Sequence, residues 1–208
     1  MKTKVLMLCL LLIAASASSF AREKAGKSAK QVLIVGLPDN VKSNYFYKGM
    51  IAEETGMQAD SIVQTYNNII ARNIAAACKE NSARFIPAQS TAVSGQILNE
   101  IKVTGEEETS YADLSAVPTE VLQKELDANG ADYLLVLNQH YLKWQEVPFR
   151  TLFHIVSYTL FDKDKNELYR GNHYFTSMDL ENAAKMEKSS RKSSSKIASS
   201  ILKSINAE

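Results

Sequence analysis

The stretch NGADYLLVLNQHYLKW, residues 129–144, constrains the fold more than any other part of the chain. It opens with Asn129-Gly130, a pair typical of a left-handed helix terminus. Tyr133–Leu137 is then apolar at every position. A strand with apolar residues on both faces must be covered on both faces, as in the interior of an α/β sheet. The stretch therefore predicts an inner strand, Asp132–Leu142, that leaves this double cover at residues 138–140.

Apolar patterns elsewhere predict the remaining strands and helices. Apolar runs and alternation predict further strands at residues 31–39, 83–88, 149–161 and 167–176, the last two joined by the polar turn DKDKNE. Apolar residues at three- and four-residue steps predict helices at residues 60–78, 115–129 and 179–205. Residues 88–114 are expected to form a surface excursion with one short helix near Val93–Ile101.

The order of these elements is β-α-β-α-β-β-β-α. Short connections between the last three strands favour an antiparallel meander, and helices separated by strands favour a sheet with helices packed on it. The sequence therefore predicts an α/β (α+β) fold with a mixed sheet that ends in an antiparallel three-strand meander.

The first 21 residues have the order of a secretory signal peptide. Lys2 and Lys4 form a basic start, Val5–Ala15 is almost wholly apolar, and SASSFA supplies small residues before a cleavage site after Ala21. The apolar stretch is shorter than the roughly 20 residues of a membrane-spanning helix, and a retained anchor is the alternative. We expect a signal peptide at 1–21, a flexible tether at 22–30 and a single globular domain at 31–208, periplasmic or secreted and without a membrane span after cleavage.

Cleavage after Ala21 would also determine the charge and the cysteine content. It removes Lys2 and Lys4 and no acidic residue, which leaves 22 basic and 23 acidic residues and a net charge near −1. A chain this close to neutral gives no electrostatic case for a nucleic-acid partner. Cys78 would be the only cysteine left, so no internal disulfide could form. The mature chain must therefore rely on its hydrophobic core.

Three histidines, His140, His154 and His173, fall on the three strands of the predicted meander. Alternation along the last hairpin places His154 and His173 on the same face. The face of His140 stays open, because a shift of one residue in the preceding loop reverses it. No HxH or HExxH spacing accompanies these residues. We expect no metal, no cofactor and no catalytic residues, with a three-histidine metal site as the alternative.

Aromatic residues offer a different kind of site. Tyr45, Phe46 and Tyr47 follow the first strand in a loop, and Tyr141 and Trp144 end the third strand. Such side chains combine a large contact area with a polar group and are enriched where proteins bind one another. Covering the edge of the sheet is the structural alternative. We predict that these five residues form a partner-binding surface.

Four phrases resemble one group of bacterial envelope proteins: VLIVGLPD (32–39), LDANGADYLLV (126–136), SYTLFDKDKNELYRG (157–171) and KIASSILKSI (196–205). They are similar to phrases of the curli-secretion lipoproteins, the peptidoglycan-synthase activator lipoproteins and the amino-terminal domain of the Tol–Pal translocation protein. The resemblance implies an anticodon-binding-domain-like α/β fold that binds other envelope proteins. It implies no catalytic residues, and the lipid-attachment Cys of the lipoproteins is missing here.

The sequence thus predicts an exported, non-enzymatic envelope protein that binds a protein or a peptidoglycan-linked partner. A metal-dependent or hydrolytic periplasmic enzyme that uses the three histidines is the alternative, although no GxSxG elbow supports it. An assembly subunit, acting as a homo-oligomer, is a third hypothesis.

Overall fold

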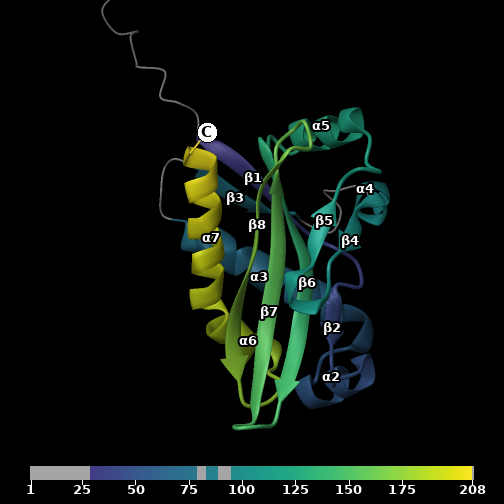
Figure 1. The fold of residues 1–208 in the computed structure, drawn as a ribbon, viewed down its shortest axis with the longest axis vertical. Coiled ribbons are helices and arrows are strands. Elements are labelled where there is room, and N and C mark those ends of the chain that lie inside the picture. Colours follow the sequence, from purple (N-terminus) through teal and green to yellow (C-terminus); the bar gives the residue numbers. More distant parts are fainter. Residues whose placement is uncertain (1–28, 79–82, 89–94, 208) are drawn as a thin grey trace, which may run out of the picture.

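A six-stranded mixed sheet organises the part of the chain described by the computed structural model, residues 29–78, 83–88 and 95–207 (Figure 1). Its order is β3-β1-β6-β7-β8, and the short β2 pairs with β6 beyond the end of β1. The strands are β1 (Lys30–Gly36), β2 (Val41–Ser43), β3 (Ala83–Pro87), β6 (Tyr133–Gln145), β7 (Thr151–Phe161) and β8 (Glu167–Ser177). The predicted signal peptide, 1–21, and the tether up to residue 28 lie outside the described residues.

The sheet has a parallel half and an antiparallel half. Val32 of β1 pairs with Phe85 of β3 on one side and with Tyr133 of β6 on the other, and both pairings are parallel. β6, β7 and β8 form an antiparallel meander, in which His154 lies opposite Phe175. The predicted α/β (α+β) fold, with a mixed sheet ending in a three-strand meander, is confirmed.

Helices cover both faces of the sheet. The α-helices of the described residues are α2 (Lys48–Thr55), α3 (Ile62–Ala77), α4 (Gly95–Glu100), α5 (Thr119–Ala128), α6 (Ala183–Ser189) and α7 (Arg191–Asn206). The face that carries Leu135 packs against α3, α6 and α7, whereas the face that carries Leu134 packs against α4 and α5. These two neighbouring leucines are 0% and 2% exposed, so the predicted double cover of this strand is confirmed. No helix within these residues has the length and apolar character needed to cross a membrane.

The structure contains elements that the predicted order lacks. β2 and α2 follow the first strand, and a small second sheet pairs β4 (Lys102–Thr104) with β5 (Tyr111–Asp113). The predicted terminal helix is divided at Ser190 into α6 and α7. There the Ser190 hydroxyl donates to the Met186 carbonyl at 2.7 Å, a local bond that competes with the regular helix pattern.

A β-bulge at Asn138 interrupts β6, which runs three residues beyond its predicted end at Leu142. The Asn138 amide donates to the Ser110 carbonyl and to the Thr159 hydroxyl, each at 3.0 Å. These bonds satisfy the buried side-chain N–H groups of Asn138 and hold the extra residue of the bulge in place. Asn138 and His140 are 1% and 2% exposed, so the prediction that the double cover ends at residues 138–140 is wrong.

Candidate functional site

Three of the five predicted aromatic residues form one cluster. The Tyr45 ring stacks on the Trp144 ring with centroids 5.9 Å apart, and the Phe46 ring meets the Trp144 ring edge-on at 5.6 Å. Tyr45 and Phe46 also contact each other, with centroids 5.0 Å apart. The loop between β2 and α2 therefore delivers its aromatics to the end of β6, about 100 positions later in the sequence.

Hydrogen bonds fix the loop that carries this cluster. The Asn44 side chain donates to the Trp144 carbonyl at 3.1 Å and accepts from the Trp144 amide at 2.7 Å. The Ser43 hydroxyl accepts from the amides of Tyr45 and Phe46 and donates to the Leu142 carbonyl. A side-chain amide that replaces a strand partner in this way fixes the backbone on both sides of Trp144.

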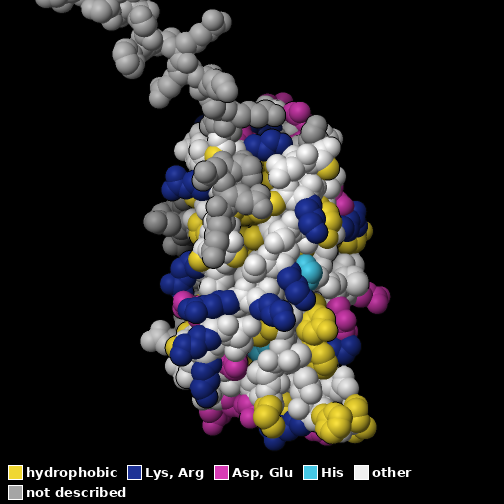
Figure 2. Space-filling model, turned by 90° about the vertical axis from the view of Figure 1, so that its left-hand side faces the viewer, with side chains coloured by type: hydrophobic (Ala, Val, Ile, Leu, Met, Phe, Trp, Pro, Cys, Tyr) yellow, Lys and Arg dark blue, Asp and Glu magenta, His cyan; other side chains and the backbone are white. Residues whose placement is uncertain are grey.

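The turn between β6 and β7 extends the cluster into solvent. The Arg150 guanidinium lies 5.0 Å from the Trp144 ring centroid, a cation–π contact, and forms an ion pair with Asp179 at 2.7 Å. Val147 and Phe149 in this turn are each 78% exposed. Figure 2 shows hydrophobic side chains gathered at the lower end of the molecule, where Figure 1 places the β6–β7 turn.

We call this region the aromatic surface; it consists of Tyr45, Phe46, Tyr47, Trp144, Val147 and Phe149. Tyr45 and Tyr47 are 56% and 68% exposed, whereas Phe46 is 8% exposed and forms the base of the surface. Exposed aromatics held in place by a rigid base have the properties of a binding hot spot, because little side-chain entropy is lost on contact.

Tyr141 does not join the aromatic surface. Alternation after the bulge places it on the opposite face of β6 from Leu142 and Trp144, and it is 4% exposed there. Burial, with a smaller contribution from Glu107, raises the pKa of the Tyr141 hydroxyl to about 12. In this position the Tyr141 side chain packs within the fold and cannot offer its ring to a partner.

His140 and His154 form a buried pair. Nε2 of His140 lies 3.3 Å from Nδ1 of His154, whose Nε2 lies 3.1 Å from the Ser177 hydroxyl. The rings pack between Tyr66, 4.7 Å from His140, and Phe175, stacked on His154 at 4.4 Å. Burial lowers the pKa of His154 to about 3 and holds the pKa of His140 well below its usual value, with His154 adding to the effect. Both rings are therefore neutral near pH 7.

His173 lies away from this pair. His173 is on β8, opposite Val156 of β7, and is partly exposed. Its ring stacks on that of Tyr158, with centroids 6.2 Å apart. Burial, and secondarily the charge of Lys196, lowers the pKa of His173. Within the described residues no three His, Cys, Asp or Glu side chains gather in a geometry that could hold a metal ion. The three histidines of the alternative hypothesis thus share a sheet but not a site.

Sequence reasoning missed the residues that complete the aromatic surface. Asn44 and Arg150 belong to no motif. The contact of Asn44 with Trp144 depends on the pairing of β2 with β6, and that of Arg150 on the β6–β7 hairpin. The sequence did offer one indication of this surface at Val147, Pro148 and Phe149. Apolar side chains are unusual in a hairpin turn unless they contact another part of the protein or a partner.

Comparisons with known proteins bear on the fold. No protein-family model and no curated protein matches the chain. The structure of the hypothetical protein CT253 from Chlamydia trachomatis matches with a TM-score of 0.50 at 8% identity, covering 86% of this chain and 99% of that one. A PelC dodecamer from Paraburkholderia phytofirmans gives 0.40 at 10% identity, over 83% and 89% of the two chains. The LpoB C-terminal domain from Salmonella enterica gives 0.31 at 11% identity, over 73% and 85%. The similarity to CT253 concerns the fold alone, and no conclusion is drawn from the weaker similarities to PelC and LpoB.

Proposed function

We propose that this chain is an exported, non-enzymatic protein of the cell envelope that binds a protein partner through the aromatic surface. The single observation that carries the proposal is the fixed arrangement of exposed Tyr45 and Arg150 on half-buried Trp144, beside the exposed turn at Val147 and Phe149. The signal-peptide pattern of residues 1–21 supports export. The mature protein would be a single domain from residue 31 onward.

The composition of the aromatic surface supports a protein as the partner. Tyr, Trp, Phe and Arg are enriched at the centres of protein interfaces, where their large rings lose little conformational entropy. The Arg150–Asp179 ion pair lies beside the Trp144 ring and offers the polar contacts that such an interface also needs. A peptidoglycan-linked partner would engage the same residues and is an outcome of the binding test.

Within the part of the chain that the structure describes, the positions of His140 and His154 do not favour the enzyme alternative. A catalytic group must reach its substrate, but His140 and His154 are 2% and 0% exposed. Each has hydrogen-bond or ring contacts that account for its position in the core. The pair is explained by packing, without a reaction.

Export can be tested by cell fractionation and mass determination of the recovered protein. We expect the protein in the soluble periplasmic or secreted fraction, with a mass that corresponds to cleavage after Ala21. Recovery of the uncleaved chain from the cytoplasm would contradict the proposal.

Binding can be tested by affinity recovery from envelope extract with matched variants. We expect Y45A and F149A to reduce recovery of the partner at least about tenfold, the effect of losing one contact worth about 1.4 kcal/mol. Y174A is the matched control, because Tyr174 is 61% exposed on β8 and contacts Phe153 rather than the cluster. Equal recovery with all three variants would exclude the aromatic surface.

A further inference from the structure

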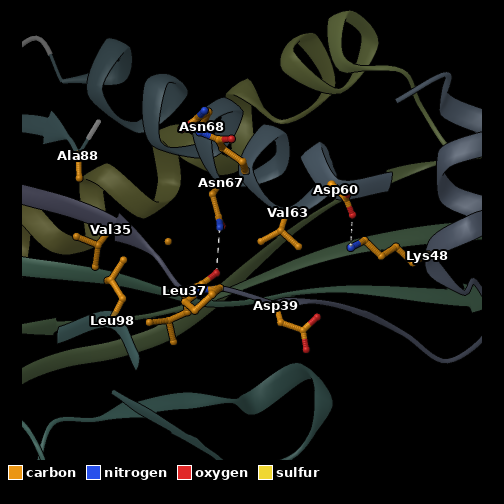
Figure 3. Close-up of a pocket in the computed structure, with 13 residues that line it drawn as sticks. Val35, Leu37, Asp39, Lys48, Asp60, Val63, Asn67, Asn68, Ala88 and Leu98 are labelled. Atoms are coloured by element: carbon orange, nitrogen blue, oxygen red, sulfur yellow. Dashed lines mark hydrogen bonds and ion pairs between the residues drawn. The ribbon is translucent and has the colours of Figure 1, made fainter. Parts of the chain in front are cut away.

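A pocket of about 470 Å³ lies at the carboxyl end of β1 (Figure 3). From β1 the chain runs through α3 to β3 on one side, and it later returns through α5 to β6 on the other. α3, which follows β1, and α4, which follows β3, cover opposite faces, so the connections that leave these two neighbouring strands diverge at their carboxyl ends. In open α/β sheets such a switch point leaves a crevice in which ligands bind. The volume is in the range of small-molecule sites.

The lower wall of the pocket is apolar and the helix above it approaches closely. Val35 lies at the left with Leu98 of α4 below it, and Val63 of α3 lies above Leu37 (Figure 3). Gly36 makes the approach possible, because a Cβ at this residue would lie 2.2 Å from Cγ of Asn67. An apolar ligand group would therefore contact side chains that are already in place.

Asn67 supplies a fixed amide within this apolar setting. Its Nδ2 donates to the Leu37 carbonyl at 3.2 Å, drawn as a dashed line in Figure 3, and its Oδ1 accepts from Asn40 at 2.9 Å. Asn40 is 4% exposed and is itself anchored to the Leu137 carbonyl at 3.0 Å. A primary amide has two N–H donors and two acceptor positions, so Asn67 keeps capacity for a ligand amide.

Charges of both signs line one end of the pocket. Lys48 pairs with Asp60 at 3.5 Å, and Asp39 lies below them in Figure 3. The side chains of Lys48 and Asp60 are 56% and 103% exposed, and that of Asp39 is 84% exposed. Ion pairs in water at this exposure are weak, so these groups can exchange their partners for the charges of a ligand.

We infer that this pocket binds a short peptide with free termini and an apolar side chain. The peptide carboxylate contacts Lys48, its ammonium group contacts the carboxylates of Asp39 and Asp60, and its amide contacts Asn67. The apolar side chain lies against Val35, Leu37 and Val63. This inference does not rest on the aromatic surface, which contributes no residue to the pocket.

Calorimetric titration of the mature protein with alanyl-leucine tests this inference. We expect the free dipeptide to bind, and its N-acetylated and C-amidated forms to bind about tenfold more weakly, the change that 1.4 kcal/mol produces. Absence of heat with the free dipeptide would overturn the inference. So would equal binding of the blocked forms, or binding of decanoate in place of the peptide.

Variants assign each contact to its residue. K48A should weaken the free dipeptide about tenfold, and in this variant C-amidation should have no further effect, because both changes remove the same contact. The double variant D39N/D60N should also bind the free dipeptide about tenfold more weakly, and in this variant N-acetylation of the dipeptide should have no further effect. Additive effects would contradict the assignment. Y45A should bind the dipeptide as the unaltered protein does, so failure of the peptide site and failure of the proposed partner binding are distinguishable.

Discussion

His140 and Trp144 lie four residues apart on the same face of β6 and differ in almost every respect. His140 is the chemically versatile side chain, yet it is 2% exposed and is held by Tyr66 and His154. Trp144 has no acid–base or metal-binding group, yet it lies near the end of β6, where its ring contacts Tyr45 and Arg150. Position along the strand, not residue type, therefore decides which side chain can meet another molecule.

The two regions also differ in how they are held. Tyr66 of α3 covers His140, whereas a loop pinned by Asn44 and Ser43 supports Trp144. Substitutions near His140 should therefore change the free energy of unfolding, while substitutions near Trp144 should change binding with little effect on stability. Four measurements test this contrast between the two regions.

The largest effect is expected at Tyr66. Y66A removes a ring that is 0% exposed and should lower the free energy of unfolding by about 3–5 kcal/mol, as loss of a buried aromatic does. Y66F should change it by less than about 1 kcal/mol, because the buried Tyr66 hydroxyl has no hydrogen-bond partner within the described residues. Urea unfolding of both variants measures the difference. A large loss in Y66F would show that the hydroxyl, and not the ring, supports His140.

The next effect concerns acid. The pKa of His154 is about 3 in the folded chain and near 6.5 when the chain unfolds, so below pH 6.5 only the unfolded state takes up the proton. The free energy of unfolding should fall by about 2 kcal/mol between pH 7 and pH 5, because the slope approaches 1.36 kcal/mol per pH unit below pH 6.5. The lowered pKa of His140 acts in the same direction. In H154Q the free energy of unfolding, measured with urea at pH 7 and at pH 5, should fall less than in the unaltered protein. An identical fall would contradict the role of His154.

A smaller effect is expected from the loop. N44A removes both hydrogen bonds to the Trp144 backbone and should cost about 1 kcal/mol, the usual net value of such bonds. Since Trp144 is the only tryptophan of the chain, its fluorescence reports on this surface alone. We expect acrylamide to quench N44A more strongly than the unaltered protein. Unchanged quenching would mean that Asn44 does not hold the cluster.

The smallest effect on stability is expected from the exposed side chains themselves. Y45A and F149A should each change the free energy of unfolding by less than about 0.5 kcal/mol, because Tyr45 and Phe149 are 56% and 78% exposed. Their melting curves should overlay that of Y174A. A loss comparable with Y66A would place these residues among the structural ones.

The sequence was sufficient to predict β1, β3, β6, β7, β8 and the main helices, because burial leaves a periodic pattern. Leu134 and Leu135 belong to opposite cores, as apolar residues at consecutive positions indicated. α2 could not be predicted in this way, since only Ile51 and Thr55 of its residues are buried and no apolar stripe marks it. The β4–β5 pair is equally inconspicuous, because all three residues of β4 are exposed.

The candidate site was predictable only in part, because it depends on register. The bulge at Asn138 shifts the alternation of β6, so that His140 faces His154 and Trp144 lies on that same face. No local sequence pattern reports a bulge held by Ser110 and Thr159, which come from other elements. The aromatic loop was recognisable from its composition, whereas Asn44 and Arg150 acquire their roles only when the strands are paired.

The most direct test of the aromatic surface is site-specific photo-crosslinking in cells. A photoreactive phenylalanine analogue replaces Phe149 in one strain and Tyr174 in another, two exposed aromatics at 78% and 61%. We predict one discrete adduct from position 149, lost when Y45A is added, and none from position 174. An adduct of twice the chain mass would identify a second copy as the partner. Adducts from position 174 alone, or equal adducts from both positions, would contradict the account.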